Sequence, residues 1–180
     1  DIQTYDEQVN SSWSEVLNQY QRRADLIPNL VASIKGYSSY EKEVLEAVTL
    51  ARSQAIRASS DLQQAPGDEQ KLQTWQQAQA QLTRTLGQLT IISERYPELK
   101  AQELYQNLIV QLEGSEYRIA VARGRYIKAI EQYNVTIRQF PAVLTAKIMD
   151  YTAKKNYLPD DVAAVSKAPT IDFSQNPNIH

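Results

Sequence analysis

Apolar residues recur every three or four positions along four successive stretches of this chain. In the first stretch, residues 5–35, this spacing places them on one stripe of a helix of about 30 residues. The stripe consists of Val9, Trp13, Val16, Tyr20, Ala24, Ile27, Val31 and Ile34. Only five glycines and seven prolines occur among the 180 residues, so few positions can end a helix. We therefore expect a chain that is helical almost everywhere.

The first break in this pattern lies at Gly36. A glycine after a helical stretch predicts a left-handed cap, and Ser38 with Glu41 has the capping-box spacing that opens a second helix over residues 39–64. The alternative is one helix that continues through Gly36 and gives an elongated three-helix rod. The capping-box spacing favours the turn.

Two further breaks lie at prolines. Pro66 and Gly67 predict a turn before a third helix from Asp68, and Pro97 predicts the boundary of a fourth helix that begins at about Glu98. Connections this short force successive helices to run antiparallel. The expected fold is therefore all-α, an antiparallel up-down four-helix bundle of long helices.

The fourth helix and the tail after it differ in composition. Tyr105, Tyr126 and Tyr133 lie on the apolar stripe of the helix, so we expect their rings in the core and their hydroxyls at its edge. The last residues are rich in Pro, Asp, Ser and Asn, which do not extend a helix. We expect a bundle domain over residues 1–157 and a poorly structured, irregular C-terminal tail over residues 158–180.

Composition excludes several classes of chemistry. The 19 basic and 21 acidic residues give a net charge of -2, which offers no general attraction to nucleic acid. Cysteine is absent and the one histidine is His180, so thiol catalysis and a Ser-His-Asp triad have no residues to use. Glu113 and Glu116 share a helix face, but such a pair beside an arginine forms a salt bridge more often than a metal site. We expect no enzymatic activity, no cofactor and no metal.

The segment "RRAD" precedes Pro28 in the first helix. Proline lacks a backbone N–H, so we expect a kink there, with Asn29 satisfying the carbonyl that loses its partner. The antiparallel layout brings Arg23 close to the level of Glu113 on the fourth helix, and a guanidinium suits a carboxylate, which predicts a structural ion pair. The alternative is a solvated face whose ion pairs contribute little.

Three stretches combine into a specific pattern: "RRADLIPNLVASIKGY", "YPELKAQELYQNLIVQLEGSEYRIAVARGRYIKAIEQYNVTIRQFP" and the late "APTIDF". In this order, and over almost the whole chain, the pattern resembles the LemA family of bacterial proteins. The resemblance implies an anchored helical bundle on the outer side of the inner or cytoplasmic membrane, with no established enzymatic activity. Some relatives take part in building magnetosome membranes.

Two hypotheses for function follow. The first is a non-enzymatic, membrane-anchored helical scaffold or adaptor on the extracytoplasmic face of a bacterial membrane, single-pass, which binds an unidentified protein partner or organises membrane. Residues 1–180 contain no apolar run of the roughly 18 residues that a membrane span needs, so this hypothesis expects an anchor upstream of Asp1. The alternative is a soluble cytosolic helical binding module unrelated to membranes.

The segment from Ile137 to Lys155 combines apolar and basic residues. In the antiparallel layout it extends past the start of the first helix, toward the bilayer if an anchor precedes Asp1. Such a segment suits an interfacial helix, because apolar side chains enter the acyl boundary while basic ones meet anionic head groups. The alternative is that it caps the lower end of the bundle. The candidate membrane-proximal face consists of Arg138, Phe140, Lys147, Ile148, Met149, Lys154 and Lys155.

Flotation with anionic vesicles tests this face. We expect residues 1–180 to bind weakly at low salt and to lose binding at high salt, because head-group attraction is electrostatic and screened. Replacement of Lys147, Lys154 and Lys155 by Glu should abolish binding. Absence of binding even at low salt would leave the segment as ordinary bundle packing.

Overall fold

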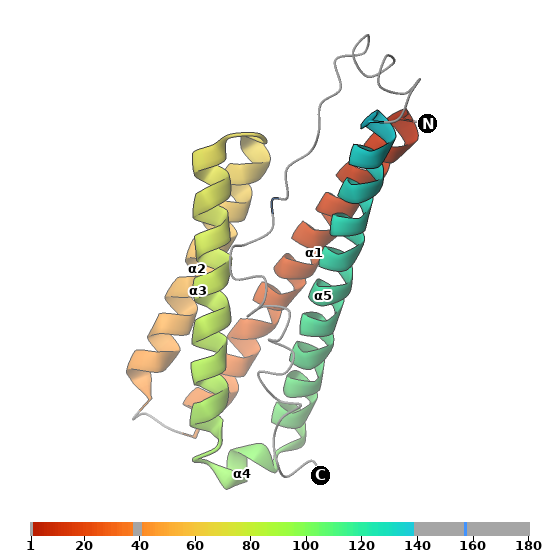
Figure 1. Cartoon of the computed structure of the whole chain (residues 1–180). Coiled ribbons are helices and arrows are strands. Elements are labelled where there is room, and N and C mark those ends of the chain that lie inside the picture. The colour runs from red at the N-terminus through yellow and green to blue at the C-terminus, as the bar shows by residue number, and fades with distance from the viewer. Residues whose placement is uncertain (1, 38–40, 139–156, 158–180) are drawn as a thin grey trace.

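A computed structural model of the chain describes residues 2–37, 41–138 and 157. These residues form helices and no strand. The helices are α1 (Ile2–Lys35), α2 (Lys42–Gln64), α3 (Glu69–Ser93), the short α4 (Pro97–Lys100) and α5 (Glu103–Arg138). The four long helices alternate in direction, and α1 packs along α5 while α2 packs along α3 (Figure 1). The predicted all-α antiparallel bundle is confirmed.

Some predictions fall on other parts of the chain. They concern Ser38, the tail over residues 158–180, and the face formed by Phe140, Lys147, Ile148, Met149, Lys154 and Lys155, all of which lie outside the described residues. Of that face, only Arg138 is described, and it is exposed at the end of α5. Within the described residues, no helix is both long enough and apolar enough to cross a membrane.

The connection between α1 and α2 differs from its prediction in two details. Gly36 follows the end of α1, but the predicted left-handed cap at this glycine is wrong. Of the five glycines, all of them among the described residues, Gly67 alone has a left-handed backbone, with φ of 94°. The α1 helix tightens instead through a bond from the Tyr37 N–H to the Ile34 carbonyl, at 2.9 Å. Because α2 begins at Lys42 and runs back along α1, the alternative of one helix that continues through Gly36 in a three-helix rod is excluded.

The start of α2 is tied to the connection between α3 and α4. The helix begins at Lys42 and not at residue 39, and the side chain of its N-cap residue Glu41 makes no capping hydrogen bond. The Glu41 carboxylate instead accepts a bond from the Tyr96 hydroxyl at 3.1 Å and lies 3.3 Å from the Arg95 guanidinium. Glu41 therefore joins the α1–α2 connection to the α3–α4 connection and does not cap its own helix.

The fourth predicted helix is two helices. Pro97 opens α4 as its first residue, but the chain turns again before α5 begins at Glu103, so a start at Glu98 was wrong. The Leu99 side chain of α4 is buried among the apolar residues at this end of the bundle. Burying Leu99 takes up an extra turn of chain, which shifts α5 by about one helical turn relative to α1.

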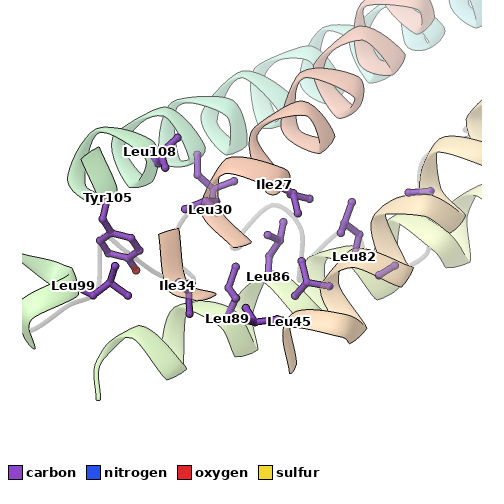
Figure 2. Packing of buried hydrophobic residues seen from close by; sticks show 14 residues of the cluster. Ile27, Leu30, Ile34, Leu45, Leu82, Leu86, Leu89, Leu99, Tyr105 and Leu108 are labelled. Atoms are coloured by element: carbon purple, nitrogen blue, oxygen red, sulfur yellow. The ribbon is translucent and has the colours of Figure 1, made fainter. Parts of the chain in front are cut away.

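The core consists of two clusters of apolar side chains, one toward each end of the bundle. Figure 2 shows the cluster near the end of α1, where Ile27, Leu30 and Ile34 approach leucines of α2, α3 and α5. The other cluster surrounds Trp75, near the start of α1 and the end of α5. The prediction that Tyr105, Tyr126 and Tyr133 are core residues is confirmed, because all three are buried.

The backbone at Pro28 is satisfied from a neighbouring helix. The α1 helix continues through this proline, whose missing N–H would otherwise bond to the Ala24 carbonyl. Arg52 of α2 donates its Nε–H to that carbonyl at 2.8 Å. The freed group is thus satisfied by Arg52 and not by Asn29, while the kink at Pro28 stays a prediction.

This arrangement couples Arg52 to Pro28. We expect Arg52→Met to lower the free energy of unfolding by about 1–2 kcal/mol, because it leaves the Ala24 carbonyl unsatisfied. In a Pro28→Ala background the restored N–H bonds to that carbonyl, so the same substitution should cost less than half as much. Urea denaturation of the four proteins measures the coupling. Equal losses in both backgrounds would contradict it.

Candidate functional site

Arg23 of α1 is fully buried and connects three helices. Its Nη1 lies 3.2 Å from the Glu116 carboxylate of α5 and donates to the Thr83 hydroxyl of α3 at 3.0 Å. Its Nη2 donates to the Gln79 side-chain oxygen, also on α3, at 3.2 Å. A planar guanidinium with several donors can hold acceptors from two helices at once, which a lysine cannot do in this geometry.

The partner of Arg23 is Glu116, so the predicted pairing with Glu113 was wrong by three residues. The residues used by α4 shift α5 by about one turn toward the α4 end of the bundle, which brings Glu116 to the level of Arg23. Glu113 is half-buried, and burial raises the pKa of its carboxyl. The sequence did carry a signal for Glu116, because it lies four residues after Leu112 and three before Ile119, both on the buried stripe.

A second buried arginine, Arg123 of α5, lies near the first. Its Nη1 donates to the Tyr20 hydroxyl at 3.1 Å, and the Arg23 guanidinium lies 5.1 Å from the centre of the Tyr20 ring. Burial raises the pKa of Tyr20, although the two guanidinium charges oppose this shift. We call these residues together the buried polar layer: Tyr20, Arg23, Gln79, Thr83, Glu116 and Arg123.

The charges of the buried polar layer do not balance. Two guanidinium groups, Arg23 and Arg123, share one carboxylate, Glu116, and all three side chains are almost completely buried. The Nε and Nη2 atoms of Arg123 have no hydrogen-bond partner within the described part of the chain. The layer therefore joins α1, α3 and α5 through buried charged and polar groups.

Aromatic side chains pack on the side of the layer that faces the start of α1. The Trp13 ring lies 5.2 Å from Trp75 and from Tyr126, and 5.9 Å from Tyr157, measured between centroids. Tyr157 comes from the chain beyond α5, and its carbonyl accepts a bond from the Gln76 side chain of α3 at 3.0 Å. These contacts hold Tyr157 against α1 and α3.

A surface groove of about 570 Å³ lies between α1 and α2. Val31, Leu45 and Leu50 provide its apolar lining, and Lys35 and Lys42 are among its polar residues. Within the described residues there is no group of three or more His, Cys, Asp or Glu side chains that could hold a metal ion, in this groove or elsewhere. The groove offers apolar contact area without a convergent set of reactive groups.

The fold and its buried layer define an all-α bundle protein whose innermost polar residues join helices. Residues 12–173 match the LemA family, and the chain belongs to that family. Two magnetosome proteins of Paramagnetospirillum magneticum, MamQ 1 and MamQ 2, are each 26% identical to it over 151 residues. The match covers 76% of this chain and 55% of each relative, so the chain spans about half the length of the curated relatives it matches.

Substitutions in the buried polar layer test whether Arg23 pairs with Glu116 or with Glu113. We expect Arg23→Met to lower the free energy of unfolding by about 3–5 kcal/mol, because it leaves the Glu116 carboxylate buried without a partner. Removing both charges, with Arg23→Met and Glu116→Leu, should recover much of this loss. Urea denaturation measures both effects.

Two controls accompany this measurement. Arg22→Met changes an exposed neighbour and should shift stability by no more than about 0.5 kcal/mol. Glu113→Gln should cost clearly less than Glu116→Gln. The opposite order would place the ion pair at Glu113 and contradict the observed register.

Proposed function

We propose that this protein is a non-enzymatic helical scaffold on the extracytoplasmic face of a bacterial membrane, tethered by an anchor that precedes Asp1. In this role the bundle presents its surface to a protein partner or helps to organise the membrane. The observation that carries the proposal is membership of the LemA family over residues 12–173. The similarity to two proteins named as magnetosome proteins supports a role in membrane organisation.

The arrangement of the helices supports tethering from one end. The start of α1 and the end of α5 lie at the same end of the bundle, which also holds the turn between α2 and α3 (Figure 1). An anchor before Asp1 would hold this end at the bilayer. The opposite end, with α4 and the connection between α1 and α2, would then face away from the membrane and be free for a partner.

The chemistry of the core supports a scaffold over an enzyme. The strongest polar constellation in the described residues, the buried polar layer, directs its groups toward α1, α3 and α5. Its charged members are arginines and a glutamate already engaged with one of them. General acid–base catalysis needs a group whose pKa lies near the working pH and that reaches a substrate. The layer supports the bundle and leaves recognition to the surface.

Membrane topology of the full-length protein tests the proposal. We expect about 20 apolar residues upstream of Asp1, because that length spans the hydrocarbon core. The protein should stay in the membrane fraction after alkaline extraction, and protease added to spheroplasts should digest the bundle. Residues 1–180 expressed without the upstream segment are the matched control and should be released by extraction.

The alternative reading makes the opposite prediction. A soluble cytosolic binding module would lack the upstream apolar segment, fractionate with soluble proteins and resist external protease until the cells are lysed. That combination would overturn the proposal.

A further inference from the structure

The side of α5 that faces away from the core carries a regular stripe of its own. Its positions alternate in steps of four and three, which is the spacing of a helix that packs against another helix. At 100° per residue they lie opposite the buried positions of α5. We call this the outer stripe: Val110, Gly114, Tyr117, Val121, Gly124, Lys128, Glu131 and Val135.

Six of the eight positions of the outer stripe are exposed, and Gly114 and Val121 are half-buried. Val110, Tyr117 and Val135 are 65%, 66% and 51% exposed, respectively, which is unusual for three apolar side chains in one line. A Cβ atom added at Gly124 would meet no atom within 4 Å. Gly124 therefore leaves room in which a side chain of a second helix can come close to α5.

Three charged side chains on or beside the stripe are unpaired in the part of the chain that the structure describes. Within the described residues, Arg118, Lys128 and Glu131 take part in no ion pair or hydrogen bond. The Arg118 guanidinium folds back over Gly114, with its Nη2 3.5 Å from the place that a Cβ would occupy. The Arg118 guanidinium therefore places a positive charge beside Gly114, while Glu131 places a negative charge toward the other end of the stripe.

We propose that α5 binds α5 of a second copy in antiparallel orientation along the outer stripe. In a two-fold pair, each contact occurs twice. Glu131 of one copy then reaches Gly114 of the other, where the Arg118 guanidinium lies, and Lys128 lies over the Tyr117 ring, a favourable cation–π arrangement. The four facing pairs are Val110 with Val135, Gly114 with Glu131, Tyr117 with Lys128, and Val121 with Gly124.

Charge decides the orientation. In a parallel pair, Lys128 would face Lys128 and Glu131 would face Glu131, and like charges across an interface oppose association. In the antiparallel pair every one of these charges meets an opposite charge or an aromatic face. Large and small residues are also matched, because each glycine faces a larger side chain. The outer stripe is complementary to itself in this one direction.

The inference concerns a surface distinct from the buried polar layer and does not rest on the proposed function. One pair of helices makes a small interface, so we expect a reversible dimer with a dissociation constant on the order of micromolar. Sedimentation equilibrium of residues 1–180 measures this constant. A chain that stays monomeric at roughly a hundred times that concentration overturns the proposal.

Charge reversal tests the facing pairs. Glu131→Arg and Arg118→Glu should each weaken the dimer about tenfold or more, because each places like charges together. The double variant restores opposite charges and should return to within about threefold of the original constant. Arg57→Glu reverses an exposed charge on α2 and is the matched control. Dimers of Glu131→Arg as tight as the original would overturn the proposal.

Cysteine cross-linking tests the orientation, because the chain contains no cysteine. Tyr117→Cys mixed with Lys128→Cys should form disulfide-linked dimers under mild oxidation, while each variant alone should form few. Circular dichroism of each variant confirms that the bundle is folded. If Tyr117→Cys cross-links alone as well as in the mixture, the pair is parallel and the proposal is wrong.

Discussion

A guanidinium group without exposed surface must find its hydrogen-bond acceptors inside the protein, and the register of this bundle depends on how Arg23 does so. Its acceptors come from α3 and α5, at 3.0 to 3.2 Å, so sliding any of these helices by one residue would separate them. The apolar clusters above and below contain leucines, isoleucines and alanines that tolerate repacking. The apolar clusters stabilise the bundle by burying apolar surface, and the buried polar layer fixes how α1, α3 and α5 are aligned along their axes.

The spacing of apolar residues predicted which side of each helix is buried, because the buried side depends only on positions along that one helix. The turn at Pro66 and Gly67 was predicted from local residue types. Asp68, where the third helix was expected to begin, is the N-cap of α3 and accepts bonds from the backbone of Gln70 and Lys71. Arg52 was not predictable. Its bond to Ala24 depends on how α2 lies against α1, and no local pattern encodes that.

The candidate site was predicted in part, since Arg23 and its cross-helix ion pair were expected but Glu116 and Arg123 were not. Glu113 and Glu116 are three residues apart on one face, so only the height of α5 relative to α1 chooses between them. That height depends on α4, a four-residue helix whose Leu99 side chain is buried in the core. Arg123 has the spacing of a buried residue, yet a charged side chain is buried so rarely that composition argues against it.

The two proposals together constrain how tethered copies meet. In an antiparallel α5 pair the anchored ends of the two bundles point in opposite directions, so both copies cannot stand upright on the same bilayer. In the proposed pairing, the C-terminal ends of the two copies of α5 lie about 31 residues apart along the helix axis, or roughly 47 Å at 1.5 Å per residue. An antiparallel pair would therefore bridge two facing membrane surfaces at about that separation. A scaffold that joins two membranes through a pair of α5 helices needs long, rigid helices more than it needs a catalytic pocket. The buried polar layer contributes this rigidity because it holds α5 against α1 and α3.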